Sequence, residues 1–101
     1  MKNNSDKREA IIKILSSHRK DITAFGVRSL YLFGSVARGD ATDESDVDVL
    51  VEFASSPGFD GYMGLKLYLE DLLGQPVDLV MSTALRTSVR PIVEQEAVRV
   101  T

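Results

Sequence analysis

Two aspartates, Asp46 and Asp48, are separated by one valine in a segment rich in strand-forming residues. Alternate residues of a strand point to the same face, so both carboxylates are expected on one face and Val47 on the other. Two carboxylates this close repel each other unless one is protonated or a cation lies between them. Mg²⁺ prefers oxygen ligands and also binds phosphate, so the pair indicates a magnesium site. A solvated acidic junction between loop and strand is the alternative interpretation of this pair alone.

A third aspartate, Asp78, lies in the apolar segment 77–81. An aspartate in such a strand is costly if it is buried without a partner. If this strand lies beside the strand expected over 47–53, Asp78 can face the same cluster, and three carboxylates could then hold two metal ions. An aspartate on an edge strand that faces water is the alternative.

Gly34 and Ser35 follow the apolar segment 27–33, where a strand should end and a short helical turn begin. Exposed backbone N–H groups at such a turn suit a phosphate, and glycine allows the phosphate to approach the backbone closely. The Ser35 hydroxyl adds a donor, and the Arg38 guanidinium could bind the same anion. A plain strand-to-turn Gly-Ser with a surface arginine would look the same in sequence.

These residues need a scaffold, and the apolar pattern predicts helices and strands in alternation. Apolar residues at roughly helical spacing predict a first helix over about 6–25, which Gly26 should end. Strands are predicted over 27–33, 47–53 and 77–81, with a possible short edge strand over 98–100. The connecting elements are a turn or one-turn helix over 34–39, a polar loop over 40–45, and helices over 59–73 and about 89–97. This order predicts an α/β (α+β) fold, a small sheet with helices packed on it.

The composition limits what kind of protein this is. A chain of 101 residues is expected to form one domain over residues 1–101, too small for a second module that recognises a large acceptor. With 44% hydrophobic residues and no apolar run near the ~20 residues of a membrane span, a globular fold away from the membrane is predicted. The absence of cysteine excludes disulfides and thiolate metal sites, and it fits a cytoplasmic protein. A net charge of −3 argues against direct nucleic-acid binding by phosphate neutralisation.

The order Gly34-Ser35, ten residues, Asp46-x-Asp48 and a later lone Asp78 resembles the nucleotidyltransferase superfamily that includes DNA polymerase beta. The chain is most similar to its smallest branch, the bacterial and archaeal MNT-domain proteins. The resemblance extends to the flanking sequence, which reads LFGSVARG over 32–39 and SDVDVLV over 45–51. It implies a short mixed sheet with helices packed against it.

The resemblance also implies roles for the individual residues. Gly34 and Ser35 would hold the β- and γ-phosphates of ATP, and Arg38 would contact the triphosphate. Asp46 and Asp48 would bind both Mg²⁺ ions. Asp78 would bind the catalytic metal and help to deprotonate the attacking hydroxyl. AMP would then pass from ATP to an acceptor, with release of pyrophosphate.

MNT proteins of this size typically pair with a HEPN-domain ribonuclease toxin, which they silence by attaching AMP to a tyrosine. The resemblance therefore implies a protein adenylyltransferase that serves as an antitoxin. Three alternatives stay open: a transferase acting on a small molecule or an RNA end, a non-catalytic antitoxin that masks its toxin by binding, and a metal-binding or structural α/β domain. Of the other polar residues, Lys66 is interpreted as solvated, and His18 receives no catalytic role.

Overall fold

The computed structural model describes residues 4–39, 46–84, 95 and 97–101. The helices in these ranges are α1 (Asn4–Ser17), α2 (Arg19–Ala24), α3 (Gly34–Arg38), α4 (Gly58–Leu73) and the 3₁₀ turn η1 (Ser82–Ala84). The strands are β1 (Val27–Phe33), β2 (Val47–Phe53), β3 (Val77–Met81) and β4 (Val98–Arg99). The predicted strands and the α/β class with a mixed sheet are confirmed.

The strands in the described part of the chain form one sheet in the order β3-β2-β1-β4. β1 pairs with β2 and with β4 in antiparallel fashion, whereas β2 and β3 run parallel. The parallel pair requires a crossover, and α4 supplies it between the two strands. The starts of β2 and β3 therefore meet at one end of the sheet.

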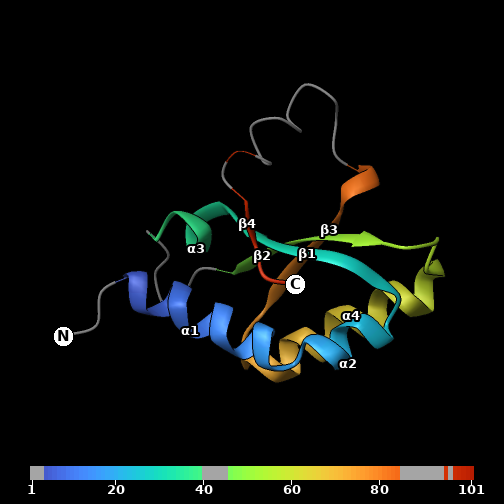
Figure 1. The fold of residues 1–101 in the computed structure, drawn as a ribbon, viewed down its shortest axis with the longest axis horizontal. Helices are drawn as coiled ribbons and strands as arrows, with labels where there is room; N and C mark the ends of the chain where they lie inside the picture. The colour runs from blue at the N-terminus through green and yellow to red at the C-terminus, as the bar shows by residue number, and fades with distance from the viewer. Residues whose placement is uncertain (1–3, 40–45, 85–94, 96) are drawn as a thin grey trace.

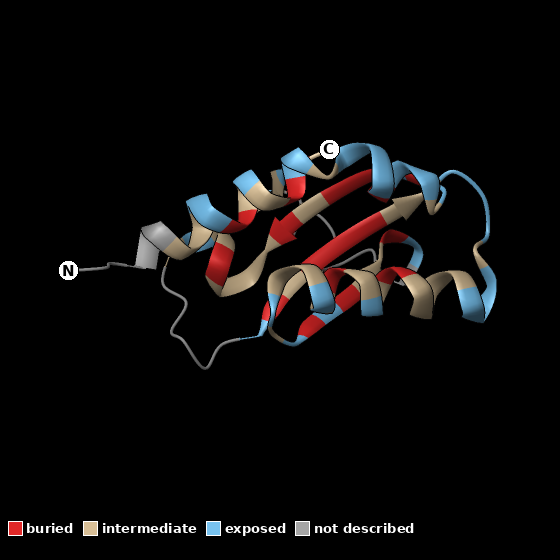
Figure 2. Cartoon of the chain, turned by 90° about the horizontal axis from the view of Figure 1, so that it is seen from below, coloured by how far each residue is buried: buried red, intermediate tan, exposed pale blue. Residues whose placement is uncertain are grey.

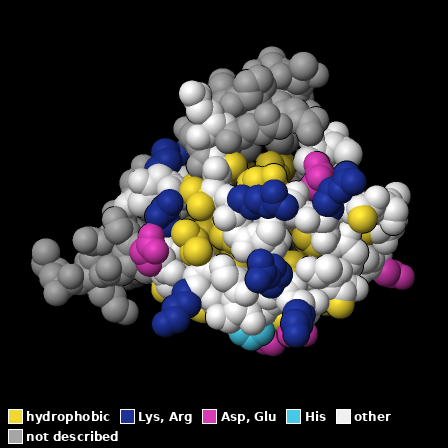
Figure 3. All heavy atoms as spheres, in the orientation of Figure 1, with side chains coloured by type: hydrophobic (Ala, Val, Ile, Leu, Met, Phe, Trp, Pro, Cys, Tyr) yellow, Lys and Arg dark blue, Asp and Glu magenta, His cyan; other side chains and the backbone are white. Residues whose placement is uncertain are grey.

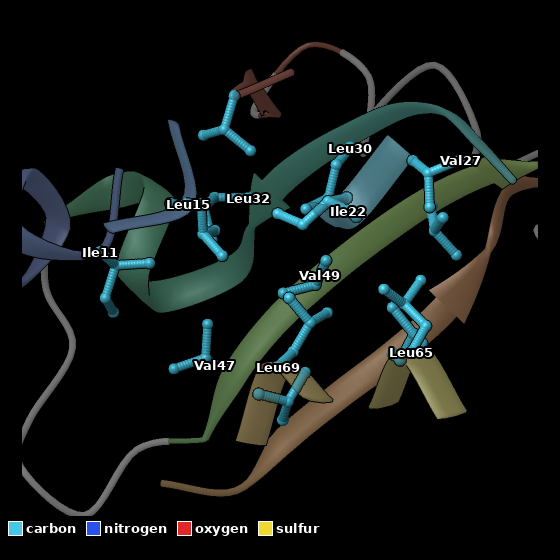
Figure 4. Close-up of a cluster of buried hydrophobic side chains, with 14 of the residues drawn as sticks. Ile11, Leu15, Ile22, Val27, Leu30, Leu32, Val47, Val49, Leu65 and Leu69 are labelled. Atoms are coloured by element: carbon cyan, nitrogen blue, oxygen red, sulfur yellow. The ribbon is translucent and has the colours of Figure 1, made fainter. Parts of the chain in front are cut away.

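Helices α1, α2 and α4 cover one face of this sheet (Figure 1). Apolar side chains at alternate strand positions point toward these helices, and Val47, Val49 and Val51 are fully buried. Leu65 and Leu69 of α4 and Leu15 of α1 pack against them in a single cluster (Figure 4). Buried residues follow the strands and the helix faces turned toward them (Figure 2). The main core therefore lies on one side of the sheet, and the opposite face holds Asp48 and Asp78 together with the buried Leu50.

The first helix departs from the prediction, because α1 and α2 are separated at His18. His18 has φ −110° and ψ 24°, and its N–H donates to the Leu15 carbonyl at 3.2 Å, which is a tighter turn than an α-helix makes. The break allows Leu15 and Ile22 to be fully buried on a twisted sheet that one straight helix would follow less well. The single helix over 6–25 was therefore wrong. The predicted loop over 40–45 and most of the helix over 89–97 lie outside the described residues.

Charge is spread unevenly over the surface. The net charge is −3, yet the face seen in Figure 3 carries mainly Lys and Arg side chains among apolar patches. The net charge of the chain therefore does not describe each of its faces. Among the described helices, none combines the length and the hydrophobicity that a bilayer crossing requires.

Candidate active site

Asp48 and Asp78 lie side by side on neighbouring strands. The register of the parallel pair sets Asp48 of β2 opposite Asp78 of β3, and adjacent strands are about 4.8 Å apart. Each aspartate lies next to a buried valine, Val47 or Val77, so both carboxylates project from the face away from the helices. Asp48 is partly buried and Asp78 is exposed. The expectation that β3 lies beside β2 is confirmed, although Asp78 is also on an edge strand of the described sheet.

The backbone of Gly34 lies directly against the Asp48 carboxylate. Phe33, the last residue of β1, is the register partner of Asp48, and Gly34 turns the chain away with φ +69°. A Cβ atom at Gly34 would collide with Oδ2 of Asp48 and come within 3.0 Å of its Cγ. Only glycine therefore combines this backbone conformation with this approach. The predicted Gly-Ser turn and the predicted carboxylates thus meet at one place.

The short helix α3 carries Ser35 and Arg38 beside this carboxylate. Val36 is fully buried and anchors the helix, and Gly39 ends it in a left-handed conformation. Arg8 of α1 donates from Nε to the Ala37 carbonyl at 3.1 Å, which satisfies a carbonyl at the end of α3. The position of Arg38 and Ser35 is therefore fixed from both sides, by the core and by α1.

Charge gathers around Asp48. Burial is the main cause that raises the pKa of Asp48 above its ordinary value, and the carboxylates of Asp78 and then Asp46 raise it further. The Arg38 guanidinium acts in the opposite direction and lowers this pKa. Asp46, Asp78 and Arg38 therefore all act on the Asp48 carboxyl, and burial together with the two acids outweighs the arginine.

The three aspartates offer the hard oxygen ligands that Mg²⁺ prefers. As the described side chains stand, no three acidic or histidine groups are gathered closely enough to hold one ion. Burial raises the pKa of Asp48 most, and a cation beside this carboxyl would relieve the repulsion from Asp78 and Asp46 that raises it further. The chemistry of these residues therefore fits a divalent ion, which would draw Asp46, Asp48 and Asp78 together.

The sequence did not reveal that two residues of α4 bind the strand that carries Asp78. Glu70 and Tyr62 form hydrogen bonds with the backbone of β3 on either side of Asp78. The i,i+4 spacing of Lys66 and Glu70 could have revealed their ion pair, which spans 2.9 Å. Lys66 was interpreted as solvated, but it is half-buried and paired. Nothing in the sequence could have shown that Glu70 reaches β3.

A groove of about 610 Å³ lies at the opposite end of β2 and β3. Its apolar side chains include Phe53, Phe59 and Met81, and Phe59 is 76% exposed. None of the predicted site residues lines this groove. The carboxylates and the groove are therefore separate features of the molecule.

Residues 8–100 match the model of the nucleotidyltransferase domain family. The chain belongs to this family. Protein adenylyltransferase MntA of Thermococcus cleftensis is 44% identical, over 91% of this chain and 94% of that protein. A solved minimal nucleotidyltransferase has a TM-score of 0.74 at 35% identity and covers 96% of this chain and 95% of its own. The predicted family is confirmed, and the chain is a nucleotidyltransferase.

A solved toxin–antitoxin structure with AMP-PNP contains a chain that is similar to this one. It is 28% identical with a TM-score of 0.69, and the match covers 93% of this chain and 72% of that chain. The fold of this chain therefore occurs in a protein that was crystallised as a toxin–antitoxin pair with a nucleotide analogue.

Proposed function

We propose that this chain transfers AMP from ATP to a tyrosine hydroxyl of a HEPN-domain toxin and thereby acts as the antitoxin. The observation that carries the proposal is the register of Asp48 and Asp78, with the Gly34 backbone against Asp48. This arrangement places the backbone of the Gly-Ser turn beside two carboxylates on one face of the sheet. The similarity to protein adenylyltransferase MntA supports a protein acceptor.

The nucleotide is held at the end of β1. The Gly34 backbone and the Ser35 hydroxyl bind the β- and γ-phosphates, and the Arg38 guanidinium neutralises part of their charge. The glycine is required because a side chain there would strike Asp48. Phosphates bound at this turn lie next to the carboxylate on β2, so the α-phosphate is presented to both aspartates.

Asp46, Asp48 and Asp78 would together hold two Mg²⁺ ions. Bound there, the ions supply stabilisation for the attacking and departing oxygens of the phosphoryl group. Asp48 is suited to both ions because it lies between Asp46 in the chain and Asp78 across the strands. Asp78 is exposed, so an acceptor hydroxyl can reach its carboxylate.

The acceptor hydroxyl gives its proton to the Asp78 carboxylate as its oxygen attacks the α-phosphorus of ATP. A new oxygen–phosphorus bond forms to the acceptor, and the bond between the α-phosphorus and its bridging oxygen breaks. Pyrophosphate leaves on the side of Gly34, Ser35 and Arg38, where its charge is bound. Each atom is accounted for, because AMP joins the acceptor and pyrophosphate takes the remaining two phosphates.

The acceptor is proposed to be a cytoplasmic partner protein that brings its own hydroxyl. In support, a relative of this chain was crystallised in a toxin–antitoxin structure with AMP-PNP. We also propose that the chain acts without direct contact to nucleic acid.

Intact mass spectrometry tests the proposal. A HEPN-domain protein from the same genome is incubated with this chain, ATP and Mg²⁺, and in parallel with Asp48→Asn. We expect the partner to gain the mass of one or more adenylate groups with the wild type and none with the variant. An unmodified partner that still forms a stable complex would contradict the transferase and indicate masking. Transfer to an added small molecule or RNA end would contradict the protein acceptor.

A further inference from the structure

Helix α4 contacts the backbone of β3 on both sides of Asp78. Oε2 of Glu70 accepts a hydrogen bond from the Val77 N–H at 2.9 Å. The Tyr62 hydroxyl donates to the Leu79 carbonyl at 2.5 Å. Val77 and Leu79 are the two chain neighbours of Asp78. Two side chains of one helix therefore hold the peptide groups that flank the third carboxylate.

These peptide groups face away from β2. The Val47 N–H donates to the Pro76 carbonyl at 3.1 Å, so residue 76 points its backbone toward β2. Backbone groups alternate along a strand, so those of Val77 and Leu79 point to the open edge. Both residues are only 3% exposed, and an unpaired buried peptide group is costly. Glu70 and Tyr62 supply the partners that a further strand would otherwise provide.

Glu70 and Tyr62 are themselves firmly placed. The Glu70 carboxylate also accepts from Nζ of Lys66 at 2.9 Å, one helical turn earlier. Between Tyr62 and Glu70 along α4, Leu65 and Leu69 are fully buried against the sheet. The helix is therefore a rigid support, and the two hydrogen bonds transmit its position to β3.

We propose that Glu70 and Tyr62 are positioning residues that hold Asp78 opposite Asp48. This inference rests on the proposed function for its effect on the rate, because Asp78 is assigned there as metal ligand and proton acceptor. Neither residue touches the substrate. They act through Val77 and Leu79, and loss of their hydrogen bonds allows β3 to shift its carboxylate relative to β2.

The test compares four variants with the wild type. Glu70→Ala removes the acceptor for Val77, whereas Glu70→Gln keeps an oxygen that can accept the same hydrogen bond. Tyr62→Phe removes only the hydroxyl. Asp71→Ala is the control, since Asp71 is an exposed acid at the next position of the same helix. Each protein is assayed for kcat, KM for ATP and Mg²⁺ requirement with the HEPN-domain partner, together with thermal stability.

We expect Glu70→Ala to lower kcat by about 10- to 100-fold, the loss that is typical when a residue supporting a metal ligand is removed. It should also raise the Mg²⁺ concentration required. KM for ATP should stay near the wild-type value, because Gly34, Ser35 and Arg38 lie on the far side of β2 from β3. Glu70→Gln should recover most of kcat, and Tyr62→Phe should show a smaller loss of the same kind.

Amide hydrogen exchange separates this inference from the proposed function. Amide exchange at Val77 is measured by NMR on this chain alone, without ATP or the partner protein that receives AMP. It should be faster in Glu70→Ala than in wild type, Glu70→Gln or Asp71→Ala. Equal exchange in all four proteins would overturn the inference, as would a kcat loss in Glu70→Ala no larger than in Asp71→Ala. If the wild type transfers no AMP, the proposed function fails. The inference is then decided by the amide exchange rate of Val77 and the carboxyl chemical shift of Asp78, each compared between Glu70→Ala and the wild type.

Discussion

The strands β2 and β3 each carry one of the two facing carboxylates, but they are supported in different ways. β2 has hydrogen-bonded neighbours on both sides, β1 and β3, and its alternate valines are fully buried. β3 has a strand neighbour on one side in the described sheet, and side chains of α4 replace the other neighbour. Asp48 is therefore held by the sheet, and Asp78 by the sheet and a helix.

This difference matters because both carboxylates must serve one reaction. A carboxylate in the centre of a sheet keeps its place unless the core itself changes. A carboxylate on an edge strand depends on a few individual hydrogen bonds, each worth about 1 kcal/mol. Helix α4 lies on the face of the sheet opposite the site. Substitutions in α4 should therefore disturb the position of Asp78 more than that of Asp48.

The largest effect is expected from removing either carboxylate. Asp48→Asn and Asp78→Asn should each reduce AMP transfer by more than about 100-fold, beyond the usual loss for a supporting residue. Each asparagine keeps the shape of the side chain, and at position 48 it also relieves repulsion between acids. Thermal unfolding should therefore show little or no loss of stability in either variant. An equal loss of activity in the two variants would show that both carboxylates are needed for the reaction, although their strands are supported differently. Retained activity in either variant would contradict the role of that aspartate as a metal ligand.

Gly34→Ala should also impair transfer severely, because its Cβ would strike the Asp48 carboxylate. A displacement near 1 Å can cost about 100-fold in rate. Gly58→Ala is a matched control, since Gly58 begins α4 with the same φ of +69° but has open space within 4 Å where a Cβ atom would lie. Both variants should lose about 1–2 kcal/mol from the left-handed backbone. Activity assays should separate them, and similar activities would contradict the proposed contact.

Tyr62→Phe should lower the free energy of unfolding by about 1 kcal/mol, the net value of one hydrogen bond. The loss reports how strongly β3 depends on α4. Denaturant unfolding measures it, and Tyr31→Phe on β1 provides a comparison with a tyrosine of a central strand. An equal or larger loss at Tyr31 would weaken the contrast between the edge and the centre of the sheet.

The smallest effect concerns acid pH. The hydrogen bond from Val77, and next that from Lys66, hold the pKa of Glu70 below its ordinary value of 4.5. Ionised Glu70 therefore stabilises the fold above about this pH, and the contribution is lost as the pH falls through the lowered pKa. The stability difference between wild type and Glu70→Gln should shrink on acidification from about pH 6 to about pH 3. Denaturant unfolding measures the stability of both proteins at each pH. A stability difference that stays constant with pH would show that Glu70 does not stabilise β3 through its charge.

Much of this arrangement was evident in the sequence. Segments rich in apolar and strand-forming residues predicted β1, β2 and β3, and the alternation of valines in β2 predicted which of its faces is buried. The spacing of Gly34, Ser35, Asp46, Asp48 and Asp78 predicted the family and the members of the candidate site. The strand predictions and the site predictions both rest on residues close together in the sequence, and such local patterns do not depend on distant residues.

The register of the sheet and the support of its edge were decided only by tertiary structure. The sequence left open whether Asp78 faces Asp48, because strand order depends on how α4 crosses from β2 to β3. Helical periodicity does not reveal the break at His18, on either side of which Leu15 and Ile22 are fully buried. Glu70 and Tyr62 lie in the helix that the sequence predicted over 59–73, which received no role at the site. Their contacts with Val77 and Leu79 arise from packing between elements, and local sequence carries no signal for them.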